Sequence, residues 1–397
     1  MQNSVIFVLT RLPKKDGKGD QVVSYYRIQS FLQLGFKISI ALISRAPPSE
    51  KVFCIESSPV NVTHFASTKA DFIIGFLHTL LLGYPLQTAL FYNGRLLDWV
   101  SKSTEAQVVY FTTFRTMLFS IKRLNAVRER LRNTRLVIDF IDAFSLNYAR
   151  THNRYAGLKK YLFKIEAERV NRCERALYEF CDISLFVSRI DKEALGFNNA
   201  LIIKNGVSIK FLQSENKIPK NMKKISFWGN LNYHPNIDAV NYFLASYWEK
   251  VLRVNPNYTF YIYGRGGSDK NVSYWNSFKN VKVVGEVSDL ASEVADSLCS
   301  VALLRTGAGM QNKVLESLAL GIPVFTTSIG RGDISATKDQ GLIVIDEAKE
   351  MLSWLEDLSN DDVLRDRMSE ASSKFIISEH NWQKNNLYFG LRLKDGL

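Results

Sequence analysis

The residues of this chain best suited to chemistry lie between Arg305 and Glu316, where a glycine-rich loop joins an apolar stretch to a helical pattern. Residues 301–304 are apolar enough for a buried strand, and residues 312–320 carry apolar side chains at helical spacing. Such a strand–loop–helix unit directs backbone N–H groups and the positive end of a helix dipole at one point, which suits a diphosphate. Lys313 could donate to a phosphate, and Glu316 could accept from ribose hydroxyls. A surface pair of these two side chains beside an ordinary turn is the alternative.

Glycine also follows other predicted strands in the second half of the chain. Three apolar runs there are each followed by a glycine: Gly229, Gly264 and Gly285. Ligands of open parallel sheets bind at the carboxyl ends of the strands, and glycine lets backbone approach a ligand closely. We therefore predict one ligand-binding edge that these glycines share with the loop 307–309.

The order of predicted strands and helices is that of an α/β protein. Apolar runs without polar alternation, such as residues 5–9 and 136–140, indicate parallel strands covered on both faces. Helical patterns separate these runs, which predicts doubly wound, Rossmann-like domains. Because 397 residues exceed one compact core, we predict two domains, with the second series of strands beginning after residue 205.

Charge is distributed unevenly between the two halves of the chain, although the overall composition is ordinary. Apolar residues make up 46% and charged residues 23%, as in soluble globular proteins. Residues 1–205 contain 29 Lys and Arg against 17 Asp and Glu, a net charge of +12, whereas the remainder balances at 22 of each. The excess predicts an anionic partner for the first domain: a membrane surface, a phosphate-bearing substrate or nucleic acid. No recognition helix, zinc spacing or RNA-binding aromatic motif is present, which disfavours nucleic acid.

Two segments of the first half could face a membrane. Residues 122–135 contain six basic side chains against Glu129, usually a solvated face but also suited to anionic headgroups. The apolar run 72–84, continued by apolar residues up to 92, is too short to span a bilayer, and we interpret it as a core helix rather than a membrane-facing patch. The start of the chain predicts a strand and not a signal peptide, and four cysteines without metal spacing indicate free cytosolic thiols.

Short motifs recur along the chain in an order and spacing that is specific when they are taken together. In the second half they are Phe227-Trp228-Gly229-Asn230-Leu231, Pro235-Asn236, 284–289 and 313–324. In the first half they are Lys18-Gly19-Asp20, 139–145 and Asn205-Gly206-Val207. With these motifs the sequence resembles a family 4 glycosyltransferase over nearly its whole length. The resemblance implies a GT-B fold with two Rossmann-like domains facing a central cleft: an acceptor-binding domain 1–205, a donor-binding domain 206–379 and a terminal helix 380–397 returning to the first domain.

The resemblance also implies roles for residues of the donor site. Gly229 would lie by the donor diphosphate, Glu286 and Val287 would meet the base through backbone atoms, and Glu316 would bind the ribose. The other donor-site candidates are Asn230, Gly264, Arg265, Gly309, Met310, Gln311, Asn312 and Lys313.

Two positions depart from the family pattern. The family often carries a glutamate eight positions before Glu316, where this chain has Ala308, so we expect the sugar contact from residues 309–311. Asn230 stands where many members have a phosphate-binding arginine, which makes Lys313 the expected phosphate cation and a catalytic candidate that stabilises the leaving diphosphate.

Aspartates of the first half are candidates for acceptor-side chemistry. Asp142 follows the predicted strand 136–140 and could take the proton of an acceptor hydroxyl, although a helix cap or salt bridge would also explain it. Asp139 lies closer to the strand interior and would anchor backbone or a neighbouring arginine. Asp20, after Gly19, either caps the first helix or belongs to a loop that contacts acceptor or diphosphate.

The implied function is transfer of a sugar from a nucleotide-diphosphate sugar, expected to be UDP-linked, to a hydroxyl of a glycan or lipid-linked acceptor in bacterial cell-surface polysaccharide synthesis. We expect a retaining reaction and, because no Asp-x-Asp motif is present, no required metal and no other cofactor. The expected location is cytoplasmic, with peripheral contact to the anionic inner face of the membrane. The alternatives are a nucleotide-sugar epimerase or phosphorylase of the same architecture, or a non-catalytic partner subunit, which Ala308 would favour.

Overall fold

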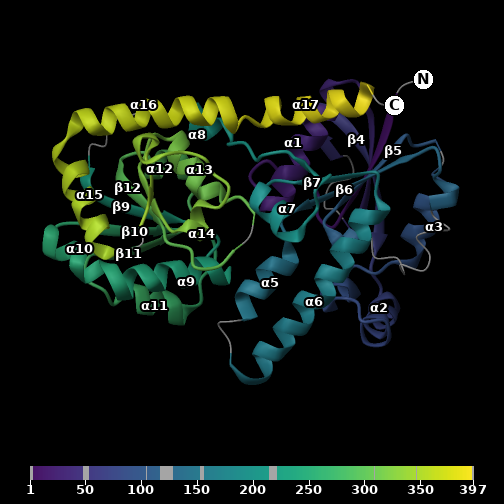
Figure 1. The fold of residues 1–397 in the computed structure, drawn as a ribbon, viewed down its shortest axis with the longest axis horizontal. Coiled ribbons are helices and arrows are strands. Elements are labelled where there is room, and N and C mark those ends of the chain that lie inside the picture. The colour runs from purple at the N-terminus through teal and green to yellow at the C-terminus, as the bar shows by residue number, and fades with distance from the viewer. Residues whose placement is uncertain are drawn as a thin grey trace. The chain divides into compact units, whose positions relative to one another are not determined.

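The computed structural model describes residues 3–47, 53–103, 105–116, 128–152, 156–213, 221–307, 309–345 and 347–395, and it divides into two compact units (Figure 1). The first unit comprises Met1–Lys204 with Gln383–Leu397, and the second comprises Asn205–Trp382. Each unit has its own parallel sheet, so the prediction of two doubly wound α/β domains is confirmed.

The sheet of the first unit has the strand order β3-β4-β2-β1-β5-β6-β7-β8. Its strands are β1 (Ser4–Leu9), β2 (Lys37–Ser44), β3 (Phe53–Ile55), β4 (Ser58–Ala66), β5 (Val108–Thr112), β6 (Arg135–Ile141), β7 (Ile183–Phe186) and β8 (Leu201–Ile202). All described pairs are parallel except β3 with β4. The sheet is apolar on both sides, because Ile6 and Val109 enter one buried cluster whereas the rings of Phe7 and Tyr110 pack against each other on the other face.

The first unit contains helices on both sides of this sheet and at its periphery. They are α1 (Gly19–Gln33), α2 (Lys69–Leu81), α3 (Gly94–Lys102), α5 (Phe144–His152), α6 (Gly157–Phe180), α7 (Arg189–Leu195) and α17 (Trp382–Asp395), with short 3₁₀ turns η1 (Leu86–Leu90) and η2 (Phe114–Thr116). Val170 of α6 belongs to the cluster around Val109, whereas Phe31 of α1 packs edge-on against Phe7. The two faces are therefore covered by different helices, as a doubly wound topology requires.

A buried ion pair joins α1 to the sheet and to α17. Arg27 is completely buried and donates to Asp139 at 3.2 Å, and the Tyr110 hydroxyl donates to the same carboxylate at 2.5 Å. Arg27 also donates to Asn386 of α17 and to the carbonyl of Ile203. A buried charge needs such partners. The role of Asp139 is therefore structural: its carboxylate neutralises the buried Arg27 and accepts a hydrogen bond from Tyr110.

The second unit contains a fully parallel sheet in the order β11-β10-β9-β12-β13-β14. Its strands are β9 (Asn221–Trp228), β10 (Thr259–Tyr263), β11 (Val281–Gly285), β12 (Ser297–Ala302), β13 (Val324–Thr326) and β14 (Leu342–Val344). Its helical segments are α8 (Ile209–Gln213), α9 (His234–Phe243), η3 (Leu244–Trp248), α10 (Glu249–Val254), α11 (Asp269–Asn276), α12 (Leu290–Val294), α13 (Asn312–Ala319), α14 (Ser328–Arg331), η4 (Lys338–Gln340), α15 (Ala348–Asn360) and α16 (Asp362–Glu379).

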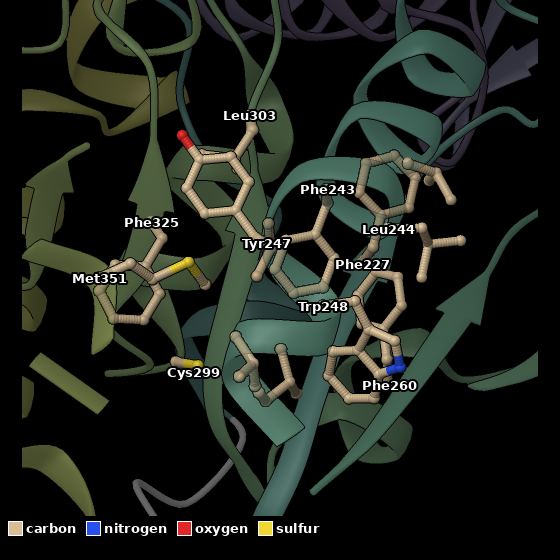
Figure 2. Packing of buried hydrophobic residues seen from close by; sticks show 14 of the residues in the cluster. Phe227, Phe243, Leu244, Tyr247, Trp248, Phe260, Cys299, Leu303, Phe325 and Met351 are labelled. Atoms are coloured by element: carbon tan, nitrogen blue, oxygen red, sulfur yellow. The ribbon is translucent and has the colours of Figure 1, made fainter. Parts of the chain in front are cut away.

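Aromatic residues fill the core between this sheet and α9. Phe243 packs edge-on against Phe260 of β10 with ring centroids 4.7 Å apart, and Trp248 lies beside both rings (Figure 2). The helical stretch from His234 to Val254 is not one regular helix, because the chain forms a π turn at η3 between α9 and α10. One wider turn changes the apolar periodicity very little, so the pattern could not reveal it.

The interpretation of residues 72–84 as a core helix is wrong. These residues form α2 and the turn after it, and their large apolar side chains are exposed. Periodicity identified the helix, but a helix that is apolar on almost every side carries no signal for which side faces the protein. In the basic stretch 122–135, residues 122–127 lie outside the described residues, and Arg128 pairs with Asp182. Over the described residues, no helix has both the length and the apolar character needed to cross a membrane.

Candidate functional site

The carboxyl ends of β9, β10 and β11 are joined by backbone hydrogen bonds between glycine-bearing loops. The N–H of Gly229 donates to the carbonyl of Tyr263 at 3.1 Å, and the N–H of Gly264 donates to the carbonyl of Gly285 at 2.7 Å. Gly264 has a φ of 138°, and a Cβ built there would lie 1.8 Å from the carbonyl oxygen of Gly229. Only glycine therefore allows these two loops to approach so closely.

Replacing Gly264 by alanine is expected to destabilise the second unit by about 3 kcal/mol or more, because a backbone carbonyl cannot move away without breaking the adjoining hydrogen bonds. Gly285→Ala is the matched control: Gly285 also has positive φ, at 85°, but no atom of the described residues lies within 4 Å of the position its Cβ would take. It should lose only about 1 kcal/mol from backbone strain. Thermal unfolding of both variants measures the difference, and equal losses would contradict the close approach.

Lys313 lies beside these loops, one residue into α13. Its ammonium group donates to the side-chain carbonyl of Asn236 and sits 4.8 Å from the centroid of the Phe227 ring. A Cβ at Gly229 would be 3.1 Å from the same nitrogen. Burial lowers the pKa of Lys313 to about 7, and the nearby Glu316 carboxylate opposes this shift. Among the residues that the structure describes, no carboxylate accepts a hydrogen bond from this ammonium group, so an anionic ligand at the strand edge would stabilise its charge.

Glu316 lies one turn further along α13. The indole N–H of Trp228 donates to its carboxylate at 2.8 Å. Burial raises the pKa of Glu316, while the Trp228 hydrogen bond and Lys313 oppose that shift. One carboxylate oxygen is therefore oriented by the last residue of β9, and the arrangement differs from the surface pair considered as the alternative.

The loop between β12 and α13 approaches the same edge. Gly307 and Gly309 have φ values of 143° and 71°, conformations that favour glycine, and Gln311 is the N-cap residue of α13. Ala308 lies outside the described residues. Thr306 is buried, and its hydroxyl finds no hydrogen-bond partner among the residues that the structure describes. The loop thus has the glycines and the polar atom needed to bind an anion at the helix N-terminus.

The other predicted donor-site residues occupy different parts of this edge. Met310 is only 7% exposed, which leaves little of its side chain for a sugar, and Asn312 accepts a hydrogen bond from Asn205 at 3.1 Å. Arg265 is exposed, and its backbone carbonyl accepts from Leu231.

Glu286 and Asn230 are both exposed near the glycine loops. Glu286 follows Gly285, and Val287 next to it is half-buried. The backbone carbonyl of Asn230 accepts from the Asn236 amide at 2.9 Å. Because β11, β10, β9 and β12 are successive neighbours, the loops after these strands form one row at the edge of the sheet.

A second group of polar residues lies at the carboxyl edge of the sheet in the first unit. Arg11, Arg115 and Asp142 follow β1, β5 and β6, which are adjacent strands. Asp142 is preceded by Ile141, whose φ of 62° is a strained conformation for a β-branched residue. The pairing of β6 with β7 shifts register at the same point. This turn releases Asp142 from the strand, and such strain is concentrated at functional sites.

Negative charges crowd around Asp142. Burial, which is the largest cause, and the charges of Asp191, Asp20 and Asp139 together raise the pKa of Asp142 to about 8, although Arg115 opposes this shift. A carboxyl group with a pKa near neutrality is suited to proton transfer. Asp142 therefore has the environment expected of an acceptor-side base.

The other first-unit candidates have mainly structural partners. Asp20 does not cap α1: Lys18 is the N-cap residue, Gln21 completes the capping box, and Asp20 accepts two hydrogen bonds from Arg11 at 2.9 and 2.8 Å. Gly19 is the first residue of α1, and a Cβ there would meet nothing within 4 Å. Asp139 anchors Arg27, as its position in the strand suggested.

Sequence reasoning missed several residues that complete these groups. Trp228 and Asn236 orient Glu316 and Lys313, and both belong to the motifs quoted above. Arg115 donates to Gln87 at 2.8 Å and lies 4.5 Å from the centroid of the Phe144 ring. Its place three residues after β5 was the available signal. Among the described residues, no group of three or more His, Cys, Asp or Glu side chains could hold a metal ion.

Comparisons with known proteins define the class of this chain. Residues 222–361 match the family model described as "Glycosyl transferases group 1". No curated protein sequence matches the chain. Among solved structures, Anabaena HepE in complex with UDP superposes with a TM-score of 0.65 at 13% identity, covering 99% of this chain and 100% of that one. TarM, from S. aureus, gives 0.68 at 12% identity, covering 99% of both chains.

WaaG, described as a glycosyltransferase involved in lipopolysaccharide biosynthesis, gives a TM-score of 0.64 at 14% identity, covering 98% of this chain and 99% of that one. The match of residues 222–361 to the group 1 family model, together with a fold shared over nearly the whole chain with these structures, identifies this protein as a glycosyltransferase of the GT-B fold. The predictions of fold and enzyme class are confirmed, and the match within the class is to group 1.

Proposed function

We propose that this glycosyltransferase, as a family 4 enzyme, moves a sugar from a UDP-sugar to a hydroxyl of a glycan or lipid-linked acceptor. The observation that carries the proposal is the meeting of Lys313, Glu316 and Gly229 at the carboxyl edge of the second sheet. These groups match a nucleoside diphosphate: a cation for phosphate, a carboxylate for ribose and a glycine that lets phosphate approach backbone. HepE, which shares the fold, has been solved with UDP, with UDP and glucose, and with UDP-glucose.

In the proposed donor complex, the N-terminus of α13 and Lys313 hold the diphosphate. Glu316, oriented by Trp228, accepts from the ribose hydroxyls. The backbone at Glu286 and Val287 meets the base, and the loop 309–311 contacts the sugar. As the bond between the sugar and the diphosphate breaks, the leaving group gains negative charge, which Lys313 and the helix end stabilise. We propose on this basis that the reaction requires no bound metal.

On the acceptor side, we propose that Asp142 receives the proton of the attacking hydroxyl. The new bond forms between that oxygen and the anomeric carbon, the diphosphate leaves with its electron pair, and the configuration at the anomeric carbon is retained. Arg115 and Arg11 lie on adjacent loops of the same edge, and two cations there suit an acceptor that carries phosphate, such as a lipid-linked diphosphate. The proposed place of action is the cytoplasmic, anionic face of the membrane, in bacterial polysaccharide synthesis.

Thermal unfolding with candidate nucleotides tests the donor site. UDP at about 100 times its dissociation constant should stabilise the protein by about 2.7 kcal/mol, a rise of several degrees in Tm. UMP should shift Tm much less, because it lacks the second phosphate that Lys313 would bind. If no nucleoside diphosphate or its sugar raises Tm, the donor site is wrong. Incubation with a UDP-sugar alone separates the alternatives: an epimerase changes the sugar, whereas a transferase leaves it unchanged or hydrolyses it slowly.

A further inference from the structure

Helix α2 of the first unit turns its apolar side chains away from the protein. Gly75 and Thr79 are its only buried residues whose side chains the structure describes. The exposed side chains are almost all large and apolar: Phe72, Ile73, Ile74, Phe76, Leu77, Leu80 and Leu81. Leu81 is 78% exposed, and Ile73 and Leu80 are 57% and 56% exposed. A helix of a soluble monomer normally has the opposite orientation, so this face indicates a partner.

The orientation of α2 is fixed by close packing on its small-residue side. A Cβ at Gly75 would lie 2.8 Å from the Cβ of Tyr92 and 2.9 Å from the Cα of Ala89, so the helix rests directly on the turn η1. At its N-terminus, Thr68 and Asp71 form a capping box. The apolar face is therefore presented by a well-anchored helix.

The chain after α2 contacts α6, which carries further exposed apolar side chains. Leu82 and Leu86, which follow α2, are exposed, and the backbone N–H of Leu86 donates to Glu166 of α6 at 2.8 Å. One to two turns before Glu166, the exposed apolar side chains of α6 are Leu158, Tyr161 and Leu162. We call α2, Leu82, Leu86 and the first turns of α6 the α2–α6 surface. Figure 1 labels the two helices that contribute to it.

Basic side chains flank this surface on α6. Lys160 and Lys164 are exposed, lie four residues apart and alternate with the apolar residues of the same turns. They stand within about 10 Å of Glu166 along the helix axis. Asp71, the acidic residue of α2, is engaged in the capping box. The surface therefore combines an apolar face with a cationic border.

We propose that the α2–α6 surface docks the enzyme on an anionic lipid bilayer, with the apolar face of α2 in the headgroup–acyl boundary and Lys160 and Lys164 among the headgroups. This inference deepens the proposed membrane association and names the element responsible. At 13 residues, or about 20 Å, α2 is too short to cross a bilayer and lies in its plane. Charge favours lipid over a second copy of this chain, because self-pairing would bring the same lysine borders together, in a half with a net charge of +12.

Vesicle flotation with paired variants tests the apolar part of the surface. Wild type should bind vesicles of phosphatidylcholine with about 30% phosphatidylglycerol at low salt, and pure phosphatidylcholine much more weakly. Ile73→Asp/Leu80→Asp should lower the affinity at least about tenfold, because two inserted side chains are lost and two negative charges gained. Val363→Asp/Ile377→Asp on α16, where the replaced residues are 77% and 57% exposed, is the matched control and should bind nearly as wild type.

A second pair of variants tests the lysine border. Lys160→Glu/Lys164→Glu should weaken binding to anionic vesicles by about fivefold or more per lysine. Lys250→Glu/Lys349→Glu changes two exposed lysines of the second unit by the same charge and should have a much smaller effect. Equal effects of the two pairs would show that net charge, and not this surface, binds the membrane, and would overturn the proposal.

Three further measurements show whether a lipid bilayer or a second copy of the chain covers the α2–α6 surface. They also separate this proposal from the proposed donor site. Phe76→Trp should shift its fluorescence to the blue on vesicle binding and be quenched by brominated lipids, relative to the wild-type background. An α2-dependent dimer in solution, with no vesicle binding, would assign the surface to a second copy and overturn the proposal. UDP stabilisation is measured on the same samples: loss of vesicle binding with UDP stabilisation retained supports docking through α2. A failure of UDP binding with α2-dependent flotation would refute only the proposed donor.

Discussion

Lys313→Met should lower kcat/KM for the nucleotide sugar about a thousandfold, since it removes a charge-assisted hydrogen bond to the diphosphate and a cation that faces the charge of the leaving group. Methionine keeps most of the length and apolar character of the lysine stem, so the packing of α13 should survive although the ammonium contact with the Phe227 ring is lost. UDP affinity alone should fall less, by about 10- to 100-fold, because the ground state carries less charge than the transition state. Steady-state kinetics and UDP titration of the same variant separate the two effects.

Protonation gives a second measurement for Lys313. Since burial lowers the pKa of Lys313 in the free enzyme to about 7, binding of a diphosphate should draw up to about half a proton at pH 7. Calorimetry in buffers of different ionisation enthalpy measures this uptake, which Lys313→Met should abolish. Lys349→Met, at an exposed lysine of the same unit, is the control. Unchanged kcat/KM and unchanged proton uptake in Lys313→Met would remove this residue from the donor site.

The same pKa shift has a consequence for stability. The free side chain in the unfolded chain stays protonated up to about pH 10, whereas the folded protein holds Lys313 neutral above about pH 7. The folded state therefore binds fewer protons in that window, and its stability falls as the pH drops from about 10 to 7. Lys313→Met should lack this loss. The free energy of unfolding of the variant relative to wild type should therefore rise as the pH drops from about 10 to 7.

Asp142→Asn should lower turnover about 100- to 10,000-fold and at the same time stabilise the protein by about 2 kcal/mol at pH 7. Activity falls because asparagine cannot accept the acceptor's proton. Stability rises for the following reason: burial raises the pKa of Asp142 to about 8, so the folded state holds a proton that the unfolded chain loses above about pH 4. Wild-type stability from this group therefore declines from pH 4 to 8, and the amide removes the decline.

The neighbouring Asp139 provides the control for Asp142. Asp139→Asn would leave the fully buried Arg27 without its countercharge and should destabilise the protein by about 3–5 kcal/mol. The two aspartates, three residues apart, are thus expected to change stability in opposite directions. In wild type, kcat/KM should rise with pH and level off above about 8 as Asp142 ionises. Full activity of Asp142→Asn would show that the proton goes elsewhere, for example to the leaving phosphate.

Much of the proposed donor edge followed from sequence because its signals are local. A strand, a glycine loop and the first turn of a helix are contiguous at 301–316, and strand-end glycines such as Gly264 mark the same edge. The partners of Lys313 and Glu316 could not be derived in this way. Asn236 and Trp228 are 77 and 88 residues away in the chain, and only the pairing of β9 with β12 brings them to α13.

At the proposed acceptor edge, less could be predicted from the sequence and more depended on the tertiary structure. Sequence singled out Asp142 from its place after a strand, but not the positive φ of Ile141 that releases it, since β-branched residues rarely adopt that conformation. Nor could sequence predict the crowding of carboxylates that raises the pKa of Asp142, because Asp20 and Asp191 approach it from α1 and α7.

By itself the sequence determined the α/β architecture, the enzyme class and the segments that build the proposed donor edge, because apolar periodicity, glycine turns and short motifs are properties of neighbouring residues. Only the tertiary structure decided which faces are covered. It showed that α2, apolar on most sides, buries the side of Gly75 and Thr79 and exposes its leucines, isoleucines and phenylalanines. It also decided how the lysine and carboxylates at the two sheet edges are charged, because burial and long-range neighbours set a pKa, and neither is encoded in any one segment.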